Sequence, residues 1–218
     1  MKNFLIVLSV LFVSLNFVLA QSPTHNSPAI AKTHVLKTEF LAPVTGNLTL
    51  SYQTQLKPEI SFQTTIGGIG IGHDINYEKP SGFFIKTGPR LMFPRFWTMD
   101  GIKRANPLAG FYFQPELAFS LFNYDAYTWT QYSSKKIRAT NTSSAILLNF
   151  GIQSVLANFL VLDLYVAGGY GVNHQDYHGH NSNGNYYEDY SSGDKYGFFS
   201  SPESSVSGTA GFNIGILF

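Results

Sequence analysis

The last stretch of the chain, Val206-Ser-Gly-Thr-Ala-Gly-Phe-Asn-Ile-Gly-Ile-Leu-Phe218, alternates apolar side chains with small or polar ones. A period of two places these two sets on opposite faces of a β-strand. The apolar face carries Phe212, Ile214, Ile216 and Phe218. This pattern predicts a strand with one face toward lipid and the other toward the interior of a barrel.

The same alternation recurs upstream in segments of about ten residues, and none of them carries a helical period. The segments are 33–43, 47–55, 59–72, 82–93, 110–122, 144–153 and 160–172. With the last strand they make eight, an even number as in single-chain outer-membrane barrels. The predicted fold is all-β, a transmembrane antiparallel up-and-down β-barrel. Segment 33–43 is the weakest, and its pairing as a strand is left open.

Two irregularities and two long connections are expected within this plan. The Gly67-Gly68 pair predicts a bulge that moves Ile69 and Ile71 to the outward face. Pro115, which cannot donate to a strand ladder, predicts another bulge. The longest connections, 123–143 and 173–205, are expected as outer loops, because outer-membrane barrels have long outer loops and short inner turns.

The N-terminus has the features of a secretory signal peptide. Lys2 precedes an apolar run from Phe4 to Val18, and Val18-Leu19-Ala20 forms a small-residue cleavage site. The run is short for a spanning helix, which disfavours an uncleaved anchor. We expect a cleaved signal peptide over 1–20, a flexible lead over 21–32 and the barrel over 33–218, in the outer membrane of a bacterial cell.

Composition narrows the function classes. The chain has no cysteine, which excludes disulfides and a lipid-modified cysteine anchor. Its net charge of +1 gives no support to nucleic-acid binding. Charged residues make up 12% and aromatic residues 16%, a balance that suits a membrane barrel with aromatic girdles. A soluble secreted β-sandwich is the alternative fold, and it would need a second sheet over every apolar face.

The strand phase places six charged residues on the inward face. They are Lys37, Glu39, Lys86, Arg90, Glu116 and Asp163. A lysine or arginine on the lipid face would cost about 2–4 kcal/mol at the midplane, so this phase is the favourable one. The interpretation we favour is a salt-bridge network that fills the barrel, since eight strands leave room only for side chains. The alternative is a narrow, gated polar path.

The 173–205 connection is rich in His and Tyr. The residues that stand out are His174, His178, His180, Tyr186 and Tyr187. Asp176 lies among the histidines, so metal binding is an alternative, but ordering a Gly- and Asn-rich loop around a metal costs entropy. A Tyr-rich recognition or adhesion surface is favoured, because tyrosine offers a large contact area at low entropy cost.

Hydrolytic chemistry would need a histidine near a serine and a carboxylate. The candidates are His73, His174, Ser192 and Glu188, whose spacing has no specificity. We therefore predict no catalytic residue, metal site or cofactor. Residues Arg95, Lys103 and Arg104, beside Phe96 and Trp97, are interpreted as part of an interfacial belt.

Three stretches carry a family resemblance. They are Asn47-Leu-Thr-Leu-Ser-Tyr-Gln53, Gly82-Phe-Phe-Ile-Lys-Thr-Gly-Pro-Arg90 and Asn106-Pro-Leu-Ala-Gly-Phe-Tyr-Phe-Gln-Pro-Glu116. The chain resembles small outer-membrane barrels of Bacteroidetes, relatives in general shape of the OmpA/OmpX-type eight-stranded barrels. The resemblance implies a location and a fold rather than a reaction.

The expected function is a non-enzymatic outer-membrane barrel whose surface loops serve envelope structure, surface interaction or adhesion. A small porin-like transporter or pore is the first alternative, and an outer-membrane lipid-modifying enzyme is the second. The expected partners are outer-membrane lipid, the barrel assembly machinery through the C-terminal strand, and an extracellular ligand of unknown identity.

Overall fold

The computed structural model describes residues 32–71, 79–93, 106–130, 133–178, 199–200 and 205–218. Its elements are β1 (His34–Glu39), the 3-10 helix η1 (Ala42–Thr45), β2 (Asn47–Lys57), β3 (Ile60–Ile69), β4 (Ser81–Phe93), β5 (Gly110–Thr130), β6 (Ser133–Leu156), β7 (Leu160–His178), β8 (Phe199–Ser200) and β9 (Val206–Leu217). Among the described residues, no helix has the length and apolar character needed to cross a membrane.

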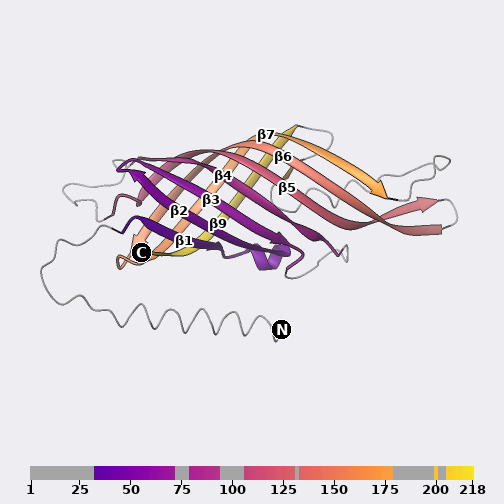
Figure 1. The fold of residues 1–218 in the computed structure, drawn as a ribbon, viewed down its shortest axis with the longest axis horizontal. Helices are drawn as coiled ribbons and strands as arrows, with labels where there is room; N and C mark the ends of the chain where they lie inside the picture. The colour runs from indigo at the N-terminus through magenta and orange to yellow at the C-terminus, as the bar shows by residue number, and fades with distance from the viewer. Residues whose placement is uncertain (1–31, 72–78, 94–105, 131–132, 179–198, 201–204) are drawn as a thin grey trace, which may run out of the picture. The chain divides into compact units, whose positions relative to one another are not determined.

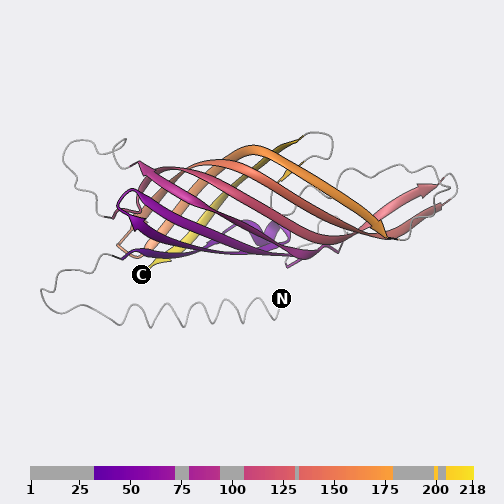
Figure 2. The same ribbon diagram turned by 45° about the horizontal axis from the view of Figure 1, so that its top comes forward.

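The strands form one closed antiparallel barrel. Each of β1 to β7 pairs with the next in the chain, β7 pairs with β9, and β9 returns to β1, so the described part contains eight barrel strands (Figures 1 and 2). The two-residue β8 lies along β9 outside this cycle. The predicted all-β, up-and-down, eight-stranded barrel is confirmed. Segment 33–43 does contribute a strand, because β1 pairs on both of its sides.

The closing seam joins the two ends of the barrel sequence. Five residues of β1, Val35 to Glu39, are in register with Leu217 to Asn213 of β9. Beyond β9, the backbones of His34 and Phe218 exchange hydrogen bonds of 3.1 and 2.9 Å. His34 and Phe218 also stack, with ring centroids 5.9 Å apart. The terminal strand therefore closes the barrel through backbone pairing as well as through its apolar face.

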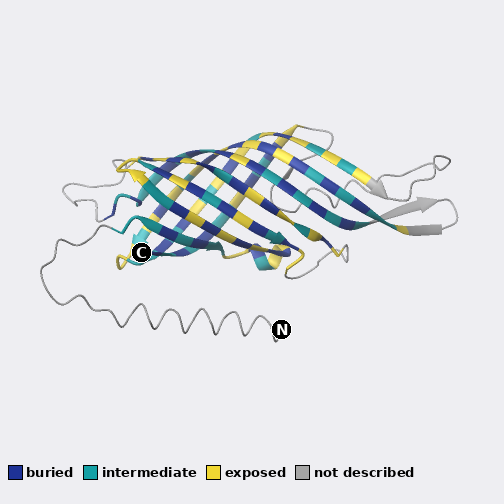
Figure 3. Ribbon diagram, viewed as in Figure 1, coloured by how far each residue is buried: buried dark blue, intermediate teal, exposed yellow. Residues whose placement is uncertain are grey.

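Burial alternates along the strands, as the period of two requires (Figure 3). In β4 the side chains of Phe84, Lys86 and Arg90 are buried, whereas Phe83 and Ile85 are exposed. Leu217, the last residue of β9, is buried, and Phe218, directly after it, is exposed. Side chains in alternate positions thus fill the interior, while many large apolar side chains are exposed on the outside of the barrel.

The bulge expected at Gly67-Gly68 is wrong. The β3 register runs without a shift from Ile60 to Ile69 against β4, and Ile69 is buried inside the barrel. Gly67 is needed for space instead, because a Cβ there would lie 2.2 Å from the ring of Phe84. The irregularity in this hairpin falls between Gln55 and Lys57 of β2.

The bulge expected at Pro115 is also wrong. Pro115 pairs with Leu148 of β6 without any shift in register. On the other side, the β4–β5 pairing stops at Thr87–Leu117 and resumes at Leu91–Phe113 in the same register. Pro89 and Pro115 face each other in this gap. Two residues without backbone N–H groups interrupt the ladder there, and no extra residue is inserted.

The prediction that residues 123–143 and 173–205 are long outer loops is wrong in part. Strands β5 and β6 pair continuously to Thr130 and Ser133, inside the expected 123–143 loop. Strand β7 continues to His178, inside the expected 173–205 loop. These outer extensions are rich in polar residues, so the apolar alternation that marked the strands stops before the strands do. Figure 1 shows the β5–β6 hairpin running past the other strands.

Candidate functional site: the barrel interior

An ion-pair cluster lies within the inner part of the barrel, the part nearer the chain ends. Asp163 of β7 accepts from Lys37 of β1 at 2.7 Å and from Arg90 of β4 at 3.1 Å, both at Oδ2. The other carboxylate oxygen accepts from the hydroxyl of Tyr112 on β5 at 2.7 Å. All three charged side chains are at most 2% exposed. Strands far apart in the sequence are therefore joined through one carboxylate.

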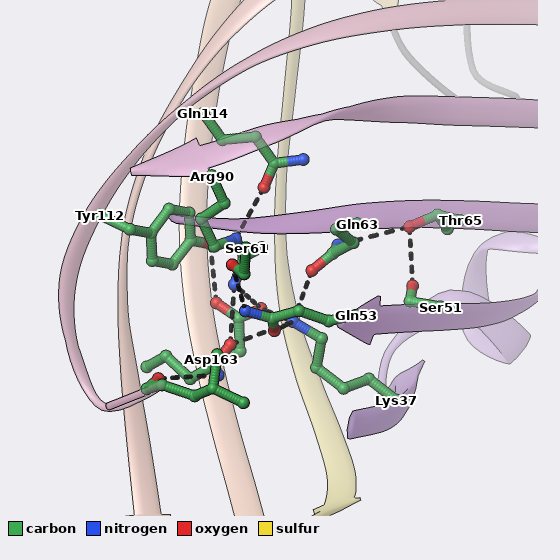
Figure 4. Close-up of polar contacts among 12 residues, drawn as sticks. Lys37, Ser51, Gln53, Ser61, Gln63, Thr65, Arg90, Tyr112, Gln114 and Asp163 are labelled. Atoms are coloured by element: carbon green, nitrogen blue, oxygen red, sulfur yellow. Dashed lines mark hydrogen bonds and ion pairs between the residues drawn. The ribbon is translucent and has the colours of Figure 1, made fainter. Parts of the chain in front are cut away.

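Glutamine side chains complete the coordination of the two cations (Figure 4). The Nζ of Lys37 also donates to the Oε1 atoms of Gln53, Gln63 and Gln153, at 3.0, 2.6 and 3.1 Å. Arg90 donates to Gln114 at 2.8 Å and to Gln153 at 2.7 Å. Buried charges are tolerated where hydrogen bonds and counter-charges replace water. This cluster meets that condition.

Tyr112 also supports Arg90 from one face. The guanidinium carbon of Arg90 lies 3.6 Å from the centroid of the Tyr112 ring, a cation–π contact. Because Tyr112 donates to Asp163 at the same time, it holds both members of the ion pair. The planar guanidinium can stack and donate together, which a lysine in its place could not do as well.

A second polar level lies nearer the outer end. Lys86 of β4 donates to Thr209 of β9 at 3.4 Å, and Glu116 of β5 accepts from Gln114 at 3.0 Å. Glu39, at the end of β1, is half-buried. Glu39, Lys86 and Glu116 line a cavity of about 20 Å³. A water molecule needs roughly 10–15 Å³ of such volume, so the space is of the order of a single water.

Apolar clusters lie in the barrel interior on both sides of the ion-pair cluster. At the inner end, Leu108 packs with Val35, Val161 and Leu217, and Leu108 itself is fully buried. The N–H of Leu108 donates to Asn106, and its carbonyl accepts from Gln153, each at 2.9 Å. The segment before β5 is thereby held across the inner mouth of the barrel.

The outer part of the interior contains two further apolar clusters. The first consists of Ala118, Ala145, Leu147 and Ala167. The second consists of Ile69, Phe84, Phe122, Tyr124 and Ala139. Apolar clusters therefore lie on both sides of the ion-pair cluster, and in the outer part they alternate with buried polar side chains such as Ser120, Asn141 and Ser143.

The structure locates all six charges that the strand phase placed inward. Lys37, Lys86, Arg90, Glu116 and Asp163 are buried, and Glu39 is half-buried beside the cavity. Lys37, Arg90 and Asp163 come together as direct ion pairs. The described residues show no ion pair within 4 Å among Glu39, Lys86 and Glu116. Tyr112 was missed, although it has the same phase as Gln114 and could have been found by extending the period by two residues.

The surface residues named from sequence are only partly described. His174 lies on β7 with its side chain exposed, and its Nε2 is 3.2 Å from Asp176. His178 ends β7. His180, Tyr186, Tyr187, His73, Glu188 and Ser192 lie outside the described residues, as does the 94–105 belt. Within the described residues, no group of three or more acidic, His or Cys side chains could hold a metal ion.

Comparison with known proteins gives little further information. No protein-family model and no curated protein matches the chain. Among solved structures, it is similar to the N-terminal β-barrel domain of Pseudomonas aeruginosa OprF, with 12% identity and a TM-score of 0.36, over 86% of this chain and 98% of that one. This superposition is too loose to bear on function. The eight-stranded fold rests on the strand pairing of the chain itself.

Proposed function

We propose that this protein is a non-enzymatic outer-membrane barrel with a sealed interior, which presents the outer ends of β5, β6 and β7 as a contact surface on the cell. The observation that carries the proposal is the burial pattern. Polar and charged side chains point into a closed barrel, while large apolar side chains are exposed around its outside. This is the reverse of what water favours and suits a barrel surrounded by lipid.

The exposed apolar surface is supplied by several strands in the same phase. On β6 the exposed side chains are Ile146, Leu148 and Phe150, whereas Leu147 and Asn149 between them are buried. Other strands contribute Leu48, Leu50, Ile66, Phe83, Leu117, Leu164, Val166 and Tyr170. Closure of the sheet leaves no open edge along the barrel, which backbone groups in a lipid environment require. With the signal peptide expected over residues 1–20, this favours an outer-membrane location.

A sealed interior argues against the pore alternative. Conduction requires a continuous water-filled path, and the described cavity has room for about one water. Apolar clusters lie on both sides of that cavity, and the cluster of Leu108, Val35, Val161 and Leu217 spans the inner mouth. The barrel interior therefore functions as a packed core that holds the strands in place.

The outer extension of the barrel supports a role in surface contact. Beyond Asn123, the described pairing of β5 is with β6 alone, up to Thr130. Strand β7 continues alongside β6 as far as Arg138 and His178. Paired strands hold an exposed surface in a fixed shape. Binding of a partner would therefore cost less conformational entropy than binding to a flexible loop.

Extraction and folding assays test the membrane part of the proposal. We expect the protein to stay with the membrane after carbonate and to be released by detergent. On a semi-native gel, the unheated protein should migrate differently from the boiled one. Release by carbonate without detergent would refute the proposal and favour a soluble sheet protein.

Liposome flux tests the sealed interior. Vesicles that contain the folded protein should leak small solutes no faster than protein-free vesicles. Flux that rises in proportion to the inserted protein would favour the pore alternative. A matched variant, Leu108→Gly, removes a fully buried side chain from the apolar cluster at the inner mouth and shows whether the assay can detect an opened barrel.

A further inference from the structure

The cavity in the second polar level lies next to an interruption in the β4–β5 ladder. Pairing between these strands is interrupted at Pro89 and Pro115, which have no N–H group to donate. Arg90 and Glu116, which directly follow the two prolines, line the cavity. Gly88 contributes no side chain here, and a Cβ at that position would lie 2.0 Å from the carbonyl oxygen of Pro115. Neither ladder hydrogen bonds nor a side chain at position 88 therefore joins β4 to β5 beside the cavity.

Lys86 of β4 and Glu116 of β5 line this cavity with unused hydrogen-bonding capacity. The two residues are 5% and 6% exposed. The ammonium of Lys86 has three N–H groups, yet among the described residues it donates only to Thr209, over 3.4 Å. Oε2 of Glu116 accepts from Gln114 at 3.0 Å, whereas its Oε1 is buried and accepts no hydrogen bond within the described part of the chain. A buried donor and a buried acceptor in one cavity therefore both need a partner.

The balance of charge indicates what kind of partner fits. The ion-pair cluster has two cations and one carboxylate, which leaves one positive charge in excess. The second polar level has one ammonium, from Lys86, and two carboxylates, from Glu39 and Glu116, which leaves one negative charge in excess. These two excesses cancel, so an added ion would bring an unbalanced charge into the barrel interior. The cavity therefore suits a neutral ligand that can both accept and donate a hydrogen bond.

We infer that the cavity is a binding site for one water molecule, which accepts a hydrogen bond from Lys86 and donates one to Glu116. The volume of about 20 Å³ fits a single water, which needs roughly 10–15 Å³. A water in this position links β4 to β5 beside the two prolines, where the backbone ladder is interrupted. The site concerns the interior alone and does not depend on what the outer surface of the barrel contacts.

A crystal structure of the wild-type mature protein in detergent tests the site directly, at a resolution that shows ordered water. We expect one density peak in the cavity, at about 2.7–3.2 Å from both Nζ of Lys86 and Oε1 of Glu116. Crystals grown with thallium(I) in place of sodium should show no anomalous peak at this position. An anomalous peak there would identify a bound cation and would overturn the inference.

Substitutions test which side chain holds the water. Lys86→Met removes the donor, so the number of long-lived internal waters, counted by water relaxation dispersion of the folded protein in micelles, should fall by one. Lys37→Met is the matched control, because it also removes a buried ammonium but Lys37 does not line the cavity. Its water count should equal that of the wild type. Glu116→Gln keeps an acceptor oxygen at the cavity and should also keep the water.

The wild-type crystal structure decides the inference even where a variant fails to fold. A cavity without density, or a direct ion pair between Lys86 and Glu116, would overturn it. An unchanged water count in folded Lys86→Met would overturn it as well. A row of waters that continues from the cavity to either end of the barrel would refute the single-water site and favour the pore alternative, which the liposome assay tests independently.

Discussion

The inner and outer halves of the barrel interior have the same strand phase but differ in chemistry. Nearer the inner end, Lys37, Arg90 and Asp163 form buried ion pairs. Nearer the outer end, Phe84 and Phe122 pack in an apolar cluster. Arg90 and Phe84 come from the same strand, six residues apart. A strand period therefore determines which face is inside, but the neighbours at each height determine whether an inside position is charged or aromatic.

The largest expected effect comes from breaking the ion-pair cluster. Asp163→Asn keeps the shape of the side chain but leaves the charges of Lys37 and Arg90 without their carboxylate. Removing one partner of a buried ion pair typically costs about 3–5 kcal/mol. Folding stability, measured by urea titration in detergent with heat-modifiable migration as the readout, should fall by that amount.

A second variant tests whether this loss of folding stability comes from unbalanced charge. In the Lys37→Met background, Asp163→Asn should cost clearly less, because only Arg90 is then left without the carboxylate. An equal cost in both backgrounds would mean that Asp163 stabilises the barrel through its hydrogen bonds, such as the one from Tyr112, rather than through charge.

The stability of the apolar cluster around Phe84 should depend on side-chain volume rather than on charge. Gly67→Ala would place a Cβ 2.2 Å from the ring of Phe84. Overpacking of a close-packed site costs about 1–3 kcal/mol. The cost should shrink when Phe84 is replaced by Leu, as a double-mutant cycle would reveal. Gly168→Ala is the matched control, because nothing lies within 4 Å of a Cβ at that position. Equal losses at Gly67 and Gly168 would contradict the steric argument.

The sequence was sufficient to predict the barrel and the inward orientation of the charged residues, because both depend on a local period of two. It was not sufficient for the role of Gly67, which depends on an aromatic ring from the adjacent strand. The ion pair between Lys37 and Asp163 likewise depends on which residues lie at the same level of the barrel. These two residues are 126 positions apart in the sequence.

The outer ends of β5 and β6 could not be predicted from the sequence, for a different reason. A strand that faces lipid needs apolar residues on its outward face, so its sequence alternates between apolar and polar or small residues. Beyond that part, Asn123 and Thr140 can pair just as well with no apolar signal, and their side chains are joined by a 2.6 Å hydrogen bond. Hydrophobic alternation therefore marks the part of a strand whose outward face is apolar, and not the end of the strand.

The smallest effect on stability is expected for a second aspartate, Asp125, which offers a comparison with Asp163. Asp125 also meets two cations, but at the exposed rim, where ion pairs contribute at most about 1 kcal/mol. The hydrogen bond from Lys136, with a further one from Arg138, lowers the pKa of Asp125 below its usual value. A lowered pKa means that its stabilisation is present above the unfolded pKa, about 3.9, and is lost as the pH falls through the folded value.

Hydrogen exchange of the β5–β6 backbone amides is the suitable measurement, because local opening of the hairpin need not unfold the barrel. Asp125→Asn should raise exchange near Asp125 and Arg138 by up to about fivefold at neutral pH, and the difference from wild type should shrink as the pH falls below about 4. Exchange of amides around Asp163 should stay unchanged. If Asp125→Asn instead lowered global stability as much as Asp163→Asn does, the contrast between a buried and an exposed carboxylate would fail, and the outer hairpin would have to be regarded as part of the barrel core.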